Sequence, residues 1–171
     1  MKVLYLIRHA KSSWEDDHLT DFERPLNERG KKDAPRMAKR MKEKEIVPEL
    51  MISSPAKRAI KTCKEFAKVL GYPKTSIKEE ETLYHASPET IMKIVQDLKD
   101  KYDVVVLFGH NPGLTEFAEW LTGEHLVNIP TCGIVGVKLK IKSWKELSQD
   151  RNKMILFDFP KKNLRKESLG L

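Results

Sequence analysis

Hydrophobic and polar positions along this chain separate strands from helices. Continuous apolar runs bounded by polar residues are typical of strands that are covered on both faces of a sheet. Two such runs cover residues 2–7 and 104–108, and shorter ones predict strands at 50–53 and 76–80. We therefore expect the runs at 2–7 and 104–108 to lie deep inside the sheet.

Between these strands, apolar residues recur at helical spacing. Gly71 is a typical helix stop, and Ser87 followed by Pro88 is a typical helix start. Pro35 lacks the backbone N–H that a helix interior requires, so it predicts a kink or a helix boundary. The whole pattern predicts helices at 28–44, 56–70 and 87–99, and a fourth that ends near 121–123.

Near the C-terminus the apolar period changes to two, as in a half-buried strand. The alternating residues are Val135, Val137, Leu139 and Ile141 on one face and Lys138, Lys140 and Lys142 on the other. Residues 154–159 are the predicted partner strand. Lysines on an open face favour an edge position, because charge discourages further strand pairing.

Strands interleaved with helices predict an α/β fold, a three-layer α/β/α sandwich around a mostly parallel sheet. In such sheets ligands bind beyond the carboxyl ends of the strands. No linker or repeat divides the 171 residues. We therefore expect a single domain, 1–171, with a basic tail from about residue 161 at its periphery.

Composition narrows the class of protein. Hydrophobic residues make up 40% and charged residues 33%, enough for a packed interior and a well-solvated surface. The first apolar run ends at Arg8, too short for a signal peptide and far below the roughly 20 residues that span a bilayer. These features predict a cytoplasmic protein. Cys63 and Cys132 have no paired spacing, so we expect both to be reduced and buried.

The formal net charge of +7 is compatible with nucleic acid, an acidic membrane surface or phosphorylated partners. Charge alone does not choose among these three. Many lysines lie along predicted helices, where a solvated face explains them, and no aromatic and basic stripe suggests base stacking. We expect neither nucleic acid nor a membrane as partner.

Three segments carry candidate chemistry at strand ends. Two buried strands each run into a histidine, at Arg8-His9 and Gly109-His110. In a third segment a short strand turns at proline into a helix, and Arg58 lies in its first turn. A helix N-terminus favours an anion, and an arginine adds a two-pronged clamp.

These residues together suit a dianionic phosphoryl group, which needs donors around its oxygens and a nucleophile in line with the leaving group. Neutral His9 can attack without a metal if its other ring nitrogen donates a hydrogen bond, for example to a nearby backbone carbonyl. His110, if partly protonated, would stabilise the transferring group or help to move a proton. The expected phosphate-binding set is Arg8, His9, Arg58 and His110.

The same segments resemble the histidine phosphatase superfamily, which is phosphoglycerate mutase-like in fold, and in particular its small bacterial phosphohistidine phosphatase branch. The similar segments are Leu6 to Ser12, Asp21 to Gly30, Ser53 to Thr62, Leu83 to Glu89 and Gly109 to Pro112. The resemblance implies that His9 is the phosphorylated nucleophile, and that Arg8, Arg58 and His110 form the phosphate pocket. It also implies no metal or cofactor, and removal of phosphate from phosphohistidine on a signalling protein.

The chain departs from the family pattern in two places. Ala10 replaces a glycine, so this position does not require a glycine-only backbone conformation. Larger relatives carry a glutamate as general acid, and His85 stands about where that residue is expected, with Glu81 as a nearby carboxylate. A missing acid favours phosphohistidine, because an imidazole leaving group is readily protonated near neutral pH.

Other residues and functions remain open from the sequence. Arg24 adds charge to the mouth of the site or forms a structural ion pair, and Trp14 contacts a partner or packs on its own domain. The substrate is a phosphorylated protein or, alternatively, a small phosphorylated metabolite hydrolysed as a phosphomonoester. A non-catalytic phosphate-binding module is an alternative of another class. A monomer is the default expectation.

Overall fold

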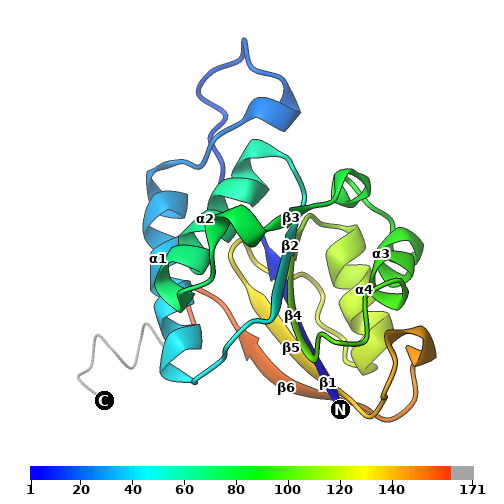
Figure 1. The fold of residues 1–171 in the computed structure, drawn as a ribbon. Coiled ribbons are helices and arrows are strands. Elements are labelled where there is room, and N and C mark those ends of the chain that lie inside the picture. Colours follow the sequence, from blue (N-terminus) through cyan, green and yellow to red (C-terminus); the bar gives the residue numbers. More distant parts are fainter. Residues whose placement is uncertain (163–171) are drawn as a thin grey trace.

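The computed structural model describes residues 1–162, so most of the predicted basic tail lies outside the described residues. A six-stranded sheet forms the centre, in the order β3-β2-β4-β1-β5-β6 (Figure 1). The strands are β1 (Lys2–Arg8), β2 (Leu50–Ser53), β3 (Lys78–Glu79), β4 (Val104–Gly109), β5 (Ile134–Leu139) and β6 (Asn152–Asp158). The first four run parallel, and β5 and β6 continue the sheet by antiparallel pairing. The predicted mostly parallel sheet is therefore confirmed.

Side chains of β1 and β4 alternate between the two faces of the sheet. Leu4 and Leu6 belong to one buried cluster, and Tyr5 and Ile7 belong to the other. The same alternation holds along β4. A strand buried on both faces has no polar face, which explains the continuous apolar runs in the sequence.

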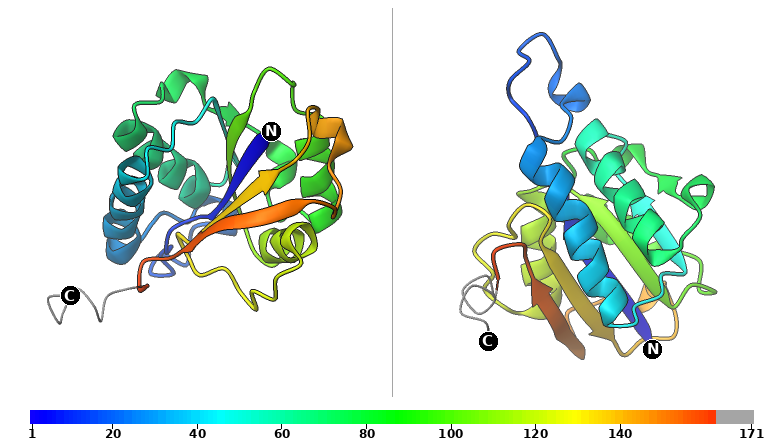
Figure 2. Two further views of the ribbon diagram at one scale, coloured as in Figure 1. Left: turned by 90° about the horizontal axis from the view of Figure 1, so that it is seen from below. Right: turned by 90° about the vertical axis from the view of Figure 1, so that its left-hand side faces the viewer.

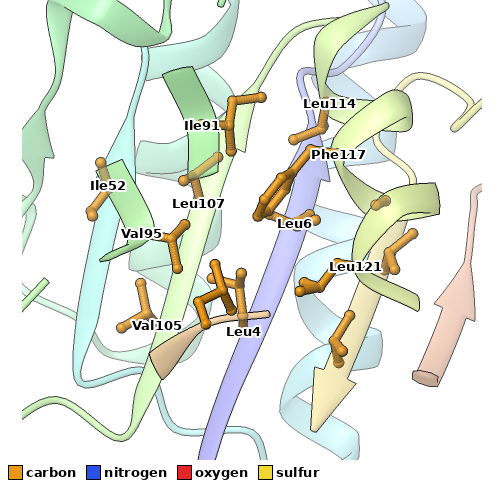
Figure 3. Close-up of a cluster of buried hydrophobic side chains, with 14 of the residues drawn as sticks. Leu4, Leu6, Ile52, Ile91, Val95, Val105, Leu107, Leu114, Phe117 and Leu121 are labelled. Atoms are coloured by element: carbon orange, nitrogen blue, oxygen red, sulfur yellow. The ribbon is translucent and has the colours of Figure 1, made fainter. Parts of the chain in front are cut away.

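Four helices cover the two faces, with α1 and α2 on one and α3 and α4 on the other (Figure 1). Their bounds are α1 Glu28–Glu43, α2 Lys57–Leu70, α3 Pro88–Gln96 and α4 Gly113–Thr122. Figure 3 shows strand side chains such as Leu6 and Leu107 pointing toward Phe117 and its neighbours on the helices. The expected three-layer α/β/α architecture is confirmed.

The helix signals are mostly confirmed. Gly71 ends α2 in the left-handed conformation, and the Ser87 side chain accepts a hydrogen bond from the backbone N–H of Thr90 at the start of α3. Pro35, however, neither ends nor bounds α1, which continues through it. Fully buried residues before and after it (Ala34, Met37 and Ala38) anchor the helix, so packing outweighs the one lost backbone bond.

Several details of the elements differ from the sequence prediction. Helix α3 ends at Gln96 instead of residue 99, and β3 is only two residues long because residues 74–76 form a 3-10 helix. The predicted edge position of β5 is wrong. It lies between β1 and β6, and its residues are buried except Lys138. The other lysines of the alternating pattern lie beyond its end at Leu139, so the pattern extended past the strand.

Cys63 and Cys132 are free and buried, as predicted. Among residues 1–162, no helix combines the length and apolarity that a bilayer crossing requires. Four 3-10 helices complete the structure: Asp21–Glu23 (η1), Lys74–Ser76 (η2), Glu81–Leu83 (η3) and Trp144–Glu146 (η4).

The segment between β1 and α1 projects beyond the carboxyl ends of the parallel strands. Figures 1 and 2 show the outer part of this segment, which spans residues 10–27, protruding beyond the sheet and helices, while Ala10 and Leu26 near its two ends are buried. It returns to the body at Gly30, where a Cβ atom would lie 2.1 Å from the carbonyl oxygen of Lys11. Glycine at this position allows α1 to pack directly on the backbone that follows His9.

Gly30→Ala is therefore expected to force α1 and the Lys11 backbone apart. Such overpacking against backbone costs about 1–3 kcal/mol of unfolding free energy. Urea denaturation of the variant measures the cost. Lys39→Ala, at an exposed position of the same helix, serves as control and should change stability by no more than about 0.5 kcal/mol. Equal stability of the two variants would show that the contact is not tight.

Candidate active site

A cleft lies at the carboxyl ends of β1 and β4, between the first turn of α2 and the projecting segment. Its volume is about 350 Å³. In-register pairing of Arg8 with Gly109 places His9 and His110, the next residues of each strand, side by side. The lining residues are Arg8, His9, Lys11, Ser12, Trp14, Asp21, Arg24, Arg58, His85, His110, Asn111 and Thr131.

His9 is buried and held in one orientation. Its Nδ1 lies 2.8 Å from the carbonyl oxygen of Ala10. A carbonyl only accepts, so Nδ1 carries the proton and Nε2 is the unprotonated nitrogen. Burial, together with the nearby positive charges of Arg58 and Arg8, lowers the pKa of His9 to about 3, against the opposing effect of the Ala10 hydrogen bond. His9 is therefore a neutral imidazole near pH 7, with the carbonyl partner that the sequence reasoning required.

The backbone around His9 is anchored from two sides. The Ala10 N–H donates to Thr62 Oγ1 at 3.0 Å, and that hydroxyl donates to the Arg58 carbonyl at 2.7 Å. On the other side, the Cys132 N–H donates to the His9 carbonyl at 3.0 Å. Ala10 is fully buried and is not among the residues with positive φ. This confirms that the position does not need glycine.

Arg8 and Arg58 bring fixed positive charge to the cleft. Arg58 is only 2% exposed, and its two terminal nitrogens donate to the carbonyl oxygen and to Oδ2 of Asp21 at 2.6 and 3.0 Å. Arg8 Nη1 donates to the Ile129 carbonyl at 3.0 Å. Within residues 1–162, the buried Nε atoms of both arginines have no hydrogen-bond partner. The protein thus leaves donor capacity unused at the bottom of the cleft.

His110 is bound to Ser54 and is uncharged. Its Nε2 lies 2.7 Å from Ser54 Oγ, which also accepts the Ala56 N–H at 3.2 Å. Burial, then the neighbouring His9 and Arg58, lower the pKa of His110 to about 2. Desolvation of the ring therefore disfavours the partial protonation that the sequence reasoning considered.

Asp21 is the cleft residue that the sequence reasoning missed. Its Oδ2 accepts hydrogen bonds from Arg58 at 3.0 Å and from the Tyr84 hydroxyl at 2.5 Å, and lies 3.1 Å from His85 Nε2. Burial alone would raise the pKa of Asp21, but the Tyr84 and Arg58 hydrogen bonds hold it well below its usual range. Asp21 was inside a quoted motif, yet nothing local shows that these partners come from two other segments, α2 and the turn after η3.

Arg24 takes both of the roles that the sequence left open. It is 7% exposed and lines the cleft, and it forms an ion pair with Asp21 at 3.1 Å. Its guanidinium carbon lies 3.4 Å from the centroid of the Trp14 ring. That ring is 76% exposed, so Trp14 is not packed into the body of the protein. It forms the outer rim of the cleft.

The two candidate acids have different positions. His85 lines the cleft, with its ring centroid 5.6 Å from that of His110. Glu81 lies in η3, is exposed, and is not among the lining residues. Asp21 is the only carboxylate lining the cleft in the described part of the chain. Within residues 1–162, no cluster of three or more His, Cys, Asp or Glu side chains is arranged to hold a metal ion.

Comparison with known proteins assigns this chain to a family and identifies solved structures of the same fold. Residues 4–102 match the histidine phosphatase superfamily (branch 1). An uncharacterised chloroplast protein of Arabidopsis thaliana is 31% identical over 151 residues, which are 84% of this chain and 69% of that protein. The structure of a proposed phosphohistidine phosphatase, SixA from Agrobacterium tumefaciens, is 27% identical with a TM-score of 0.80, and the match covers 93% of this chain and 98% of that one. A mycobacterial glucosyl-3-phosphoglycerate phosphatase shares the fold at 13% identity, with a TM-score of 0.64 over 93% and 99% of the two chains.

The low pKa of His9 predicts a loss of stability in acid. Between pH 6.5 and about 3 the unfolded chain binds a proton that folded His9 does not, so stability rises with pH across this window. His9 alone should contribute a fall of about 2 kcal/mol between pH 7 and pH 5. Urea denaturation at both values should therefore show a smaller fall for His9→Gln than for wild type.

The exposed Gln149 provides the control for this measurement. Gln149→Asn should keep the wild-type pH dependence, because neither amide side chain binds a proton in this pH range. Identical slopes for His9→Gln and wild type would mean that His9 is not desolvated in the folded protein.

Proposed function

Because this chain belongs to the histidine phosphatase superfamily, we propose that it removes phosphate from phosphohistidine on a signalling protein, through a phosphorylated His9. The observation that carries the proposal is a neutral, buried His9 beside fixed positive charge. Three arginines, Arg8, Arg24 and Arg58, line one cleft with a single carboxylate. This excess of positive charge matches a dianionic phosphoryl group.

The hydrogen bond to Ala10 determines what His9 can do. It retains the proton on Nδ1, so Nε2 is the nitrogen with a free electron pair. After Nε2 has attacked phosphorus, the ring still holds the Nδ1 proton and carries positive charge. A cationic imidazole is a good leaving group, so water can displace it in the second step without a metal.

The remaining phosphate contacts are assigned to Arg8, Arg58 and His110. The unused donor capacity of the two arginines is available to equatorial oxygens. His110 Nδ1 also lacks a partner within residues 1–162, so neutral His110 serves as a hydrogen-bond donor when Nδ1 carries the proton. His110 would then orient the phosphoryl group through a hydrogen bond and would contribute no positive charge.

The carboxylates in and near the cleft indicate which leaving group the site can accept. Asp21 is ionised because its hydrogen bonds lower its pKa, so it holds no proton to donate. Glu81 is outside the cleft. With no carboxylic acid in the cleft to protonate it, an alkoxide leaves poorly, whereas an imidazole leaving group is protonated more readily near neutral pH. This supports phosphohistidine as substrate, in agreement with the similarity to the proposed phosphohistidine phosphatase.

The partner is proposed to be a phosphorylated protein domain in the cytoplasm, acted on by a single-domain monomer that needs no cofactor. The exposed Trp14 at the rim provides an apolar contact for such a domain. Tyr and Trp side chains are often the main anchors of protein interfaces.

Phosphate release from a phosphohistidine-bearing signalling domain tests the proposal. Wild type should release phosphate rapidly under metal-free conditions, and His9→Ala should be inactive because it lacks the nucleophile. A panel of small phosphomonoesters, measured under the same conditions, should be poor substrates. Acid quenching would destroy the labile phospho-His9, so the intermediate should be trapped under alkaline conditions.

Two results would contradict the proposal. Much faster turnover of a small phosphomonoester would make the chain a metabolite phosphatase, as one neighbour of the same fold is named. Tight binding of the phosphorylated domain without any release would favour a non-catalytic phosphate-binding module.

Arg58→Lys separates the geometry of the clamp from its charge. Lysine keeps the positive charge but loses the planar fork that contacts two oxygens at once. We expect kcat/KM to fall about 10²-fold. Arg29→Lys changes an arginine on α1 that is paired with Asp33 at 3.4 Å and does not line the cleft, and should leave kcat/KM unchanged. Equal kcat/KM for the two variants would show that Arg58 supplies charge alone.

A further inference from the structure

Three histidines lie in a row in the cleft. The ring centroids of His9 and His110 are 5.2 Å apart, and those of His110 and His85 are 5.6 Å apart. The proposed function uses the first two and assigns no task to His85. Because His85 is at the solvent side of the row, with 55% of its side chain exposed, it can exchange protons with water.

His85 is held in place by several independent contacts. Its backbone has φ of 52°, a left-handed conformation that costs free energy in a residue with a side chain. Its ring centroid lies 4.2 Å from that of Tyr84, and its Nε2 lies 3.1 Å from Asp21 Oδ2. The carbonyl just after it, that of Ala86, is packed so closely on α4 that a Cβ at Gly113 would lie 1.9 Å away. The position of His85 is therefore set by the fold.

The contact with Asp21 determines which proton of His85 can move. Ionised Asp21 only accepts hydrogen bonds, so His85 Nε2 carries a proton in both charge states of the ring. Nδ1 forms no hydrogen bond with any residue of the described range 1–162. The mobile proton is the one on Nδ1, and Asp21 keeps the ring in the tautomer that allows this.

We propose that His85 is the proton-transfer residue of this site, replacing a carboxylic acid, and that Asp21 is its positioning residue. This inference rests on the proposed function. The groups that face His85 are Asp21, Tyr84 and His110, with Arg58 bound to the same carboxylate oxygen.

His85 donates a proton in the first step of the proposed reaction and accepts one in the second. In the first, His9 Nε2 forms a bond to phosphorus while the bond from phosphorus to the substrate imidazole breaks. The Nδ1 proton of the His85 imidazolium moves to the departing nitrogen, and a neutral histidine leaves. In the second, water attacks phosphorus and gives its proton to His85 Nδ1, while the electron pair of the P–N bond returns to His9 Nε2. Phosphate leaves, and both histidines regain their initial states.

The chemistry of donor and acceptor supports this assignment. The departing nitrogen of an imidazole accepts a proton, and an imidazolium can donate the proton that a carboxylic acid would otherwise supply. A histidine in the cleft can therefore take the place of the missing carboxylic acid.

A leaving-group series tests the inference. Wild type and His85→Asn are compared on the phosphohistidine domain, phenyl phosphate and p-nitrophenyl phosphate, using kcat/KM, which reports the first phosphoryl transfer. Asparagine tolerates the left-handed backbone but cannot transfer a proton. We expect His85→Asn to lose about 10²-fold on the phosphohistidine domain and on phenyl phosphate. On p-nitrophenyl phosphate, whose leaving group departs as a stable anion, the loss should be small.

His125→Asn is the matched control, because His125 also contacts a carboxylate, Glu119 at 3.1 Å, but lies outside the cleft. It should match wild type on all three substrates. In His85→Ala, added imidazole should restore turnover of phenyl phosphate, since a free imidazole can reach an exposed site and replace the missing ring.

The results distinguish the two proposals. If His85→Asn loses the same factor on every substrate, or loses nothing, His85 has a structural role only and the inference is wrong, while His9-dependent phosphate release would still support the proposed function. If wild type hydrolyses none of the three substrates, both proposals fail.

Discussion

Parallel pairing of β1 with β4 is the constraint on which the rest of this structure depends. Both strands are buried on both faces, so they must lie in the middle of the sheet, and their register is fixed by two sets of alternating side chains. With Arg8 opposite Gly109, the next residue of each strand is a histidine at the same edge. A shift of one residue would turn every side chain of a strand to the other face and would separate the two rings.

Burial then determines the chemistry of these histidines. Desolvation, reinforced by the arginines, keeps His9 and His110 neutral. The same arginines would be costly to bury alone, and Asp21 compensates by accepting hydrogen bonds from both Arg24 and Arg58. One carboxylate therefore holds the clamp in place, yet leaves the cleft with an excess of positive charge for an anion.

Contacts of Asp21 run from the base of the cleft to its solvent-exposed rim. Asp21 contacts His85 as well as Arg58, while Arg24 lies between Asp21 and the exposed Trp14 ring. The projecting segment thus contributes groups from the base of the cleft to its rim. A group bound at Trp14 would be linked to Arg58 through Arg24 and Asp21.

The sequence by itself determined the layer architecture, the two central strands and the positions of Arg8, His9, Arg58 and His110. These follow from local signals, because an apolar run, a helix start and the residue after a strand are all readable along the chain. Two local signals were outweighed by long-range contacts. The helix boundary considered at Pro35 does not occur, because packing holds α1 together, and β5 is not an edge strand, because β6 pairs with it.

The charge states and the hydrogen-bond partners of the site residues were decided only by the tertiary structure. The neutrality of His110 depends on burial by distant segments, and the importance of Asp21 depends on donors from α2, from the turn after η3 and from its own loop. The structure also shows that His85 lines the cleft whereas Glu81, only four positions away in sequence, faces solvent. Desolvation and hydrogen bonding act through space, so no pattern along the chain records them.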